Sequence, residues 1–284
     1  MREEFYFNHA KDIIEYYLKN NLHIEEIIED LEPFNKRNLK LIFDRIYYIY
    51  THNLLEKNLL FSREEIDEKK KIEIFMNKVK RDFYLPKNQW EACVFYYKHG
   101  IPFLPYDIIE NLENRDFIDG GAHIGDFALI FEKYFYPKKI FAFEPEKSNY
   151  NLMLKTIKRN KLKKVIPIQK GLGMSNCHLK LKSQESGSFI SENGDQEIEI
   201  ITLDSYVFTE NLNVGLIKLD VEGFALEVLK GAKETIKKFK PVLLIGNYHS
   251  GSEFFGALDF IRKINLNYKI LIKKLNPAAA FLET

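Results

Sequence analysis

Glycine is unevenly distributed along the chain, and this distribution sets the strongest limit on how the chain folds. Only one of the 14 glycines, Gly100, occurs in residues 1–110, and the others all lie beyond residue 119. Helix interiors disfavour glycine, whereas tight turns and close backbone approaches require it. A chain of 284 residues is long enough for about two domains. We therefore predict a helical region over 1–110 and a turn-rich domain over 111–284.

Residues 1–110 carry the signals of amphipathic helices. Apolar residues recur every three to four positions over 13–18 and over 39–50, as on the buried face of a helix. Ser62 followed by Glu65 is a capping-box pattern, and it predicts a helix over 63–82.

Aromatic residues are concentrated in the same region. Of the 23 Phe, 16 Tyr and one Trp, half lie in residues 1–110, several of them between 90 and 106. Pro86 predicts a further helix over 86–98, just ahead of the second domain. Aromatic faces fill cores, anchor interfaces and stack on sugars. Besides a place in the core, three roles stay open for the region: assembly, including a homo-oligomer through its helices, a lid, or one wall of an acceptor site.

Beyond residue 115, short apolar runs alternate with amphipathic stretches. The apolar runs predict strands over 115–119, 139–144, 164–168, 214–220, 241–246 and 268–272. The stretches between them predict helices over 125–135, 147–160, 223–238 and 253–264. This alternation is typical of an α/β fold with a mostly parallel sheet and helices on both faces. Residues 177–203 break the alternation, because they indicate consecutive strands with a turn at Asn193-Gly194.

The composition limits the classes of partner and compartment. The 42 basic and 41 acidic residues leave a net charge of +1, so the totals point neither to nucleic acid nor to a charged membrane. Two cysteines are too few for a disulfide scaffold and indicate the cytoplasm. The N-terminal sequence lacks the pattern of a secretory signal, and no run of about 18 apolar residues predicts a membrane span.

Chemistry-bearing residues gather at the predicted carboxyl ends of the strands, where open α/β sheets bind ligands. The first strand ends in Asp119-Gly120-Gly121 and continues through Gly125 into a helix, which lets the backbone approach a ligand closely. Glu144, at the end of the second strand, can accept both hydroxyls of a ribose. The glycine spacing departs from the dinucleotide fingerprint G-x-G-x-x-G. A tight turn without a ligand and a solvated carboxylate are the alternatives.

Two later strand ends add acids and a histidine. The fourth strand ends in Lys218, Asp220 and Glu222, and charges at the end of an apolar strand are either paired or functional. His249 follows the fifth strand, and a neutral imidazole is a good base near pH 7. A structural ion pair and a structural histidine are the alternatives here.

The segments DFIDGGAHIG, FAFEP, TLDSY, IKLDVEG, LKGA and PVLLIGNYH follow one another in this order over roughly residues 115–284. Together they resemble the FkbM family of S-adenosylmethionine-dependent methyltransferases, and KLDVEG followed by LKGA is the specific part. The resemblance implies a Rossmann-like methyltransferase fold with a seven-stranded sheet whose last strand is antiparallel. It also implies S-adenosylmethionine as donor, S-adenosylhomocysteine as product, and O-methylation of a sugar, a glycan or a natural-product hydroxyl.

The family pattern carries over residue by residue. The cofactor turn matches at Asp119, Gly121 and Gly125, and the ribose-binding acid matches at Glu144. The D-x-E-G motif matches at Asp220, Glu222 and Gly223, and the late histidine matches at His249. The chain departs from the pattern at His123, where Asn is usual, and at Asn247, where an acid is common. It stops at Phe281–Thr284, where we expect the last strand to begin, so that strand is expected to be short or truncated.

These matches imply a mechanism and leave two rival classes open. We expect Gly120 and Asp220 to join the cofactor site, and His249 or Asp220, with Glu222 in the same catalytic set, to remove the hydroxyl proton during an in-line displacement. We expect no metal, because Asp220 and Glu222 have no third ligand at a fixed spacing. A nicotinamide-dependent oxidoreductase and a non-catalytic assembly module that retains the fold are the rivals.

Overall fold

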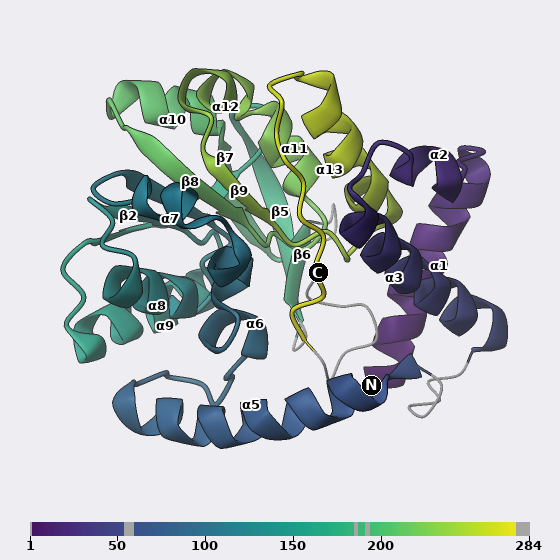
Figure 1. Ribbon diagram of the computed structural model, residues 1–284. Coiled ribbons are helices and arrows are strands. Elements are labelled where there is room, and N and C mark those ends of the chain that lie inside the picture. Colours follow the sequence, from purple (N-terminus) through teal and green to yellow (C-terminus); the bar gives the residue numbers. More distant parts are fainter. Residues whose placement is uncertain (1, 54–59, 185–186, 191–193, 277–284) are drawn as a thin grey trace. The chain divides into compact units, whose positions relative to one another are not determined.

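The computed structural model describes residues 2–53, 60–184, 187–190 and 194–276 (Figure 1). The chain forms two compact units, Met1–Phe75 with Gly246–Thr284, and Met76–Ile245. The first unit is thus built from two stretches that are far apart in the sequence. The division falls inside α5 (Arg63–Asp82), so the predicted boundary at residue 110 lies within the second unit.

Four helices form the first unit's core. They are α1 (Arg2–Lys19), α2 (Ile24–Ile28), α3 (Pro33–His52) and α13 (Gly251–Lys263). The apolar stripe predicted over 39–50 is the buried face of α3, where Ile46 and Ile49 are almost completely inaccessible. Phe254 and Phe255 of α13 pack into the same cluster, so both sequence stretches contribute to one hydrophobic core.

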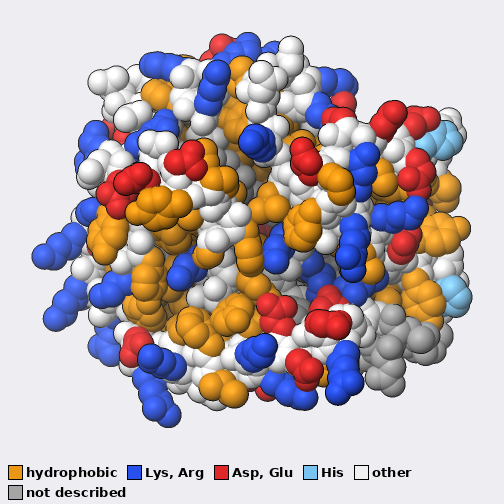
Figure 2. Space-filling model, viewed as in Figure 1, with side chains coloured by type: hydrophobic (Ala, Val, Ile, Leu, Met, Phe, Trp, Pro, Cys, Tyr) orange, Lys and Arg blue, Asp and Glu red, His pale blue; other side chains and the backbone are white. Residues whose placement is uncertain are grey.

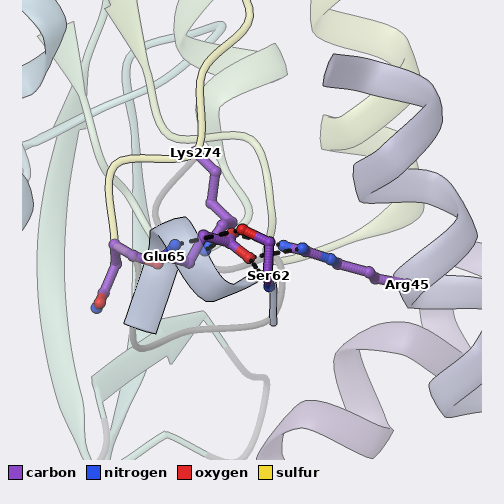
Figure 3. Close-up of polar contacts among 5 residues, drawn as sticks. Arg45, Ser62, Glu65 and Lys274 are labelled. Atoms are coloured by element: carbon purple, nitrogen blue, oxygen red, sulfur yellow. Dashed lines mark hydrogen bonds and ion pairs between the residues drawn. The ribbon is translucent and has the colours of Figure 1, made fainter. Parts of the chain in front are cut away.

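The capping box predicted at the start of α5 is confirmed. The Ser62 amide donates to Glu65 Oε2 at 2.8 Å, and the Glu65 amide donates to Ser62 Oγ at 3.3 Å. The Glu65 carboxylate also accepts hydrogen bonds from two guanidinium nitrogens of Arg45, at 2.8 and 2.9 Å, and forms an ion pair with the Lys274 ammonium at 2.9 Å (Figure 3). One acid therefore joins α3, α5 and the segment that follows α13.

The second unit contains a parallel sheet of five strands in the order β3-β2-β1-β8-β9. Its strands are β1 (Asp116–Gly120), β2 (Ile140–Phe143), β3 (Val165–Ile168), β8 (Val214–Leu219) and β9 (Val242–Ile245). All four strand pairings are parallel. The first five predicted strands are therefore confirmed, and β1, β2 and β8 are buried throughout because helices cover both faces.

Helices flank this sheet on two sides (Figure 1). From β1 the chain moves outward through α8 (Asp126–Tyr134), β2, α9 (Lys147–Asn160) and β3. It later returns to β8, beside β1, and moves in the opposite direction to β9. Right-handed crossovers that run in opposite directions place their helices on opposite faces. The order reverses between β1 and β8, and this switch point is where such sheets bind ligands.

The helices on the return path differ from the single helix predicted over 223–238. The segment forms α11 (Ala225–Lys230) and α12 (Lys233–Phe239), and α10 (Leu203–Thr209) precedes β8. At the break, the Gly231 carbonyl accepts from the Asp204 amide, and the Asp204 carboxylate accepts from the amides of Glu234 and Thr235 at the start of α12. Residue 231 has room only for glycine, because an added Cβ would lie 2.0 Å from the carbonyl oxygen of Gly173.

The helix predicted over 86–98 is wrong in extent. Only α6 (Ala92–Phe95) is α-helical, followed by the 3₁₀ segment η1 (Lys98–Phe103) and α7 (Tyr106–Glu110). Left-handed backbone angles at Lys98, His99 and Gly100 stop any helix from continuing. Upstream, the Asn160 side chain of α9 satisfies both backbone polar groups of Tyr84 and so replaces a helical turn.

The number of strands in the main sheet also differs from the seven expected. Within the described residues the sheet has five strands, and the segment 268–272 forms none. Its backbone bonds to asparagine side chains of α3 instead: Asn35 Nδ2 donates to the Ile270 carbonyl, Asn35 Oδ1 accepts from the Ile272 amide, and Asn38 donates to the Ile272 carbonyl. The final strand expected near Phe281–Thr284 lies outside the described residues.

The strands predicted within 177–203 form a separate sheet in the order β4-β7-β5-β6. Its strands are β4 (Gly171–Leu172), β5 (Cys177–Gln184), β6 (Gly187–Ile190) and β7 (Gln196–Ile201). Leu181, Ile198 and Ile200 make its small apolar core. The turn predicted at Asn193-Gly194 falls partly outside the described residues.

The described surface carries mixed charge. On the face that Figure 2 shows, Lys and Arg side chains are interspersed with Asp and Glu, in keeping with the net charge of +1. Of the helices described, none has the length and apolar character that crossing a membrane requires.

Candidate active site

A buried ion pair marks the switch point of the main sheet. Lys218, near the end of β8, places its ammonium 3.0 Å from Oδ1 of Asp119, near the end of β1. The ammonium also donates to the carbonyl of Gly121 at 2.7 Å. Asp119 is completely buried and Lys218 nearly so. The paired-charge alternative weighed for Lys218 is therefore what the structure shows, with Asp119 as the partner.

Several carboxyls share this single lysine. Asp126, the first residue of α8, is buried, and Asp220 follows β8. Burial opposes the charged form of the lysine, but Asp119, Asp220 and Asp126 outweigh burial and raise the pKa of Lys218 above its usual range. Burial raises the pKa of Asp119 to about 6, although the Lys218 ammonium opposes the shift. The cluster thus holds more acidic groups than its one cation balances.

One atom of this cluster has no partner. Asp119 Oδ2 is buried and has no hydrogen bond within the part of the chain that the structure describes. Leaving a buried acceptor unsatisfied costs about 1–3 kcal/mol or more. A bound ligand with a donor group would satisfy this oxygen.

The glycines in and beside the turn after β1 occupy positions with different structural demands. Gly121 has φ +74°, and an added Cβ would lie 1.9 Å from the Asp220 carbonyl oxygen, so a side chain is excluded by the neighbouring backbone. Gly125 has φ +81° and precedes the first residue of α8. Gly120 completes β1 and accepts a hydrogen bond from the Asp220 amide. The turn is therefore packed tightly against the end of β8.

Glu144, directly after β2, lies beside this turn. Its Oε2 accepts from the His123 amide at 2.8 Å, and its Oε1 accepts from the Glu146 amide at 2.9 Å. Burial raises the pKa of Glu144 to about 8, against the two backbone bonds that favour the carboxylate. The solvated-carboxylate alternative does not apply, since only 6% of the residue is exposed.

His123, which stands where Asn is usual, has a backbone angle that suits either side chain. Its φ of +46° lies in the left-handed region, where Asn, Asp and His are the side chains most often found. The contact it makes to Glu144 comes from its backbone amide. Burial lowers the pKa of the His123 ring to about 4, so the ring is neutral near pH 7.

The two acids after β8 differ in exposure. Asp220 is half-buried and contributes to the electrostatics of Lys218, Asp119 and His123. Glu222 is exposed and has a left-handed φ of +51°. The structure therefore brings Asp220 together with Asp119. Among the described residues, no group of three or more His, Cys, Asp or Glu side chains is arranged to hold a metal ion.

His249 belongs to the first unit and has a carboxylate partner that the sequence interpretation missed. Its Nδ1 lies 3.0 Å from Oε2 of Glu253, whose side chain is fully buried. The carboxylate that contacts His249 therefore comes from the first turn of α13 and not from position 247. The pattern Ser250-x-x-Glu253, a capping box, is the signal that could have found it.

His99 is a second residue that the sequence interpretation missed. Its ring packs against Phe127 and Phe131 of α8, with centroids 5.4 and 6.2 Å away. Burial lowers the pKa of His99 to about 3, and the charge of Lys218 adds to this effect. The left-handed stretch 98–100 that presents this ring has no recognisable sequence signal besides Gly100.

The parallel sheet, its reversal between β1 and β8 and the acids at that point define a Rossmann-like methyltransferase fold. A solved structure with this fold is the FkbM methyltransferase from Methylobacillus flagellatus KT, with a TM-score of 0.62 and 17% identity. The match covers 94% of this chain and 58% of that one, so the chain spans less than two thirds of that relative.

Sequence comparison gives the family. The model of the methyltransferase FkbM domain matches residues 119–270, more than half of the chain. The chain therefore belongs to the FkbM methyltransferase family, as its motifs predict. It is also 28% identical over 175 residues to the hexuronic acid methyltransferase AglP of Haloferax volcanii, a match that covers 60% of this chain and 70% of AglP.

Proposed function

We propose that this protein is an S-adenosylmethionine-dependent O-methyltransferase that acts on a carbohydrate hydroxyl. The observation that carries the proposal is the buried Glu144 carboxyl beside the glycine turn. Each of its oxygens accepts one backbone N–H, and a carboxylate oxygen has capacity for a further hydrogen bond. The pair of oxygens can therefore receive the two hydroxyls of a ribose.

The second support is the unsatisfied oxygen of Asp119. An ammonium group is a donor without acceptor capacity, and it suits a buried carboxylate in a cluster rich in acids. S-adenosylmethionine carries an adenosine, with its ribose, on one side of the sulfonium and an amino-acid group on the other. Glu144 and Asp119 end adjacent strands, so one such molecule can reach both.

The donor supplies an electrophilic methyl group on a sulfonium. The chain's task is to hold the donor and the acceptor in line and to accept the hydroxyl proton. We propose that the donor is bound by Asp119, Gly120, Gly121, Gly125, Glu144 and Asp220. Lys218 keeps Asp119 ionised and fixed in place.

We propose that His249, oriented by Glu253, accepts the proton of the acceptor hydroxyl. When Nδ1–H donates to Glu253, the lone pair of the ring is on Nε2, which is the form a general base needs. Asp220 is the alternative base, and Glu222 stays in the proposed catalytic set. The base assignment is tested separately from donor binding.

The name of a relative and the net charge support the proposed acceptor class. AglP is a hexuronic acid methyltransferase, which makes a uronic acid the first acceptor to test. The near-neutral surface favours a small molecule or carbohydrate over nucleic acid. We assign to residues 1–110 the acceptor side or homo-oligomeric assembly, in a cytoplasmic setting.

The test measures binding and transfer together. We expect S-adenosylhomocysteine to raise the melting temperature and NAD to leave it unchanged. We expect methyl transfer from S-adenosylmethionine to a uronic acid or uronic-acid glycoside, with D119N weakening donor binding. D116N is the matched control, because Asp116 is equally buried at the opposite end of β1, where it accepts from the Asn213 amide.

Each rival has its own outcome. Stabilisation by NAD instead would favour the oxidoreductase. Donor binding without transfer to any member of a panel of sugars, nucleotide-linked sugars and natural-product alcohols would favour the assembly module. Equal loss of donor binding in D119N and D116N would remove the assigned role of Asp119.

A further inference from the structure

His99 lies in a run of three consecutive residues with left-handed backbone angles. Lys98 and His99 both have left-handed φ angles, +49° and +50°, ahead of Gly100 at +84°. Non-glycine residues in this region cost of the order of 1 kcal/mol each and persist where surrounding contacts impose them. Among the contacts on His99 are an edge-on contact of its ring with Phe127 and a tilted contact with Phe131.

The ring carries a second unexplained feature. Its Nε2 is buried and has no hydrogen bond to any of the residues that the structure describes. The apolar packing of the ring would be served equally well by Phe, which has no nitrogen to satisfy. The left-handed backbone holds this nitrogen in place, and a bound polar group would satisfy it.

The neighbours of His99 connect its ring to the ion pair of Lys218 and Asp119. The Phe127 ring that contacts His99 also lies under the Lys218 ammonium, 5.7 Å from its centroid. Lys218 in turn binds Asp119. Five buried side-chain atoms of the described residues have no hydrogen bond, and two of them, Asp119 Oδ2 and His99 Nε2, lie in one cluster at the switch point between β1 and β8.

We propose that His99 is a donor-binding residue, and that its Nε2 forms a hydrogen bond with the amino-acid end of S-adenosylmethionine. This inference rests on the proposed function. Glu144 takes the ribose at the end of β2, and the unsatisfied oxygen of Asp119 in β1 suits an ammonium, so the amino-acid group is the part of the donor that we place toward β1 and β8. That end carries an ammonium and a carboxylate, and a neutral imidazole can serve either of them.

Two ligands that differ only in this end provide the test. S-adenosylhomocysteine has the amino-acid group, and 5′-methylthioadenosine keeps the adenine, ribose and thioether without it. In H99F, which keeps a ring against Phe127, we expect about tenfold weaker binding of S-adenosylhomocysteine and unchanged binding of 5′-methylthioadenosine. E144Q, by contrast, should weaken both. Isothermal titration of the full chain measures both affinities.

Two further variants guard against misfolding. H99N suits the left-handed backbone better than Phe and is too short to place its amide at the position of Nε2, so it should show the same selective loss. H178F makes the same change at an exposed histidine of β5 and should alter neither affinity. In H99F, H99N and H178F, unchanged binding of 5′-methylthioadenosine reports that the site is folded.

The outcomes are separable. Equal loss of both ligands in H99F and H99N would show that His99 only shapes the fold, and no loss of either would show that it does not touch the ligand. Both results overturn the proposal while leaving the proposed function intact. If the unmodified chain binds neither ligand, the proposed function fails and this inference fails with it.

Discussion

Oε2 of Glu253 receives two hydrogen bonds from one residue, since both the backbone amide and Nδ1 of His249 lie within 3.1 Å of it. The ring is thereby fixed in orientation by an acid with no solvent exposure. This is the arrangement expected of an oriented base.

We predict that H249Q lowers kcat by about 100-fold or more, because general-base assistance is lost, and leaves donor affinity unchanged. E253Q should lower kcat in the same direction but less. S250A is the control: it removes the cap of α13 and costs about 1 kcal/mol of stability without slowing transfer. Methyl transfer under saturating donor measures kcat, and full activity in H249Q would exclude the assignment.

The pKa of Glu144 predicts how stability changes with pH. An acid whose pKa is higher in the folded state, here about 8 against an unfolded value near 4.3, binds its proton more tightly when folded. Its stabilising contribution is complete below about pH 4.3 and is lost as the pH rises through about 8.

E144Q should therefore become more stable relative to the unmodified chain as the pH rises from about 6.5 to 8, by an amount of the order of 1 kcal/mol or more. This window lies above the pKa of Asp119, about 6, so Asp119 contributes little to the difference. Urea unfolding of both proteins without donor measures it. A difference that is constant with pH would show that Glu144 is ionised throughout.

We expect the cluster of Arg45, Glu65 and Lys274 to stabilise the first unit in a pH-dependent way (Figure 3). Burial alone would raise the pKa of Glu65, but its contacts with Arg45 and Lys274 lower it to about 2. A lowered pKa stabilises the fold above about pH 4.3, and this contribution is lost as the pH falls through about 2.

E65Q should cost about 3 kcal/mol at pH 7, because it removes the carboxylate that Arg45 and Lys274 share in a largely buried cluster. K263A removes an exposed ion pair with Asp259 and should change stability by less than about 1 kcal/mol. Thermal unfolding at pH 7 compares them, and equal effects of the two variants would contradict the assigned role of the cluster.

The two glycines of positive φ in the turn after β1 should respond differently to alanine. In G121A the new Cβ meets a backbone oxygen at 1.9 Å, so the end of β1 or of β8 must move and donor binding should be lost. In G125A the nearest atom is Met153 Cγ at 3.0 Å, on a flexible side chain, and the cost should be about 1 kcal/mol from the backbone angle alone. Calorimetric unfolding and titration with S-adenosylhomocysteine distinguish the two, and equal losses would contradict this account.

The buried strands were the most predictable part of the fold. Five apolar runs locate β1, β2, β3, β8 and β9 to within about two residues, because a strand covered on both faces has to be apolar throughout. The run over 268–272 has the same character but forms no strand. Apolar content records burial and says nothing about the hydrogen-bond partner, which here is the side chain of Asn35 or Asn38.

The site was predictable where it lies on a strand end. Asp119, Glu144 and Asp220 follow apolar runs directly, so their placement at one edge of the sheet follows from the parallel topology. His99 and Glu253 were missed for different reasons. His99 depends on a left-handed turn and on packing against α8, whereas Glu253 acts on a residue four positions earlier through a helix cap.

The first unit's core has a consequence for the order in which the chain folds. Phe254 and Phe255 complete the cluster formed by α1 and α3, yet they are synthesised after the whole sheet of the second unit. On the ribosome, α1 and α3 emerge before the second unit, Met76–Ile245, and α13 emerges after it. The core of the first unit can therefore be completed only after the residues of the second unit have been synthesised.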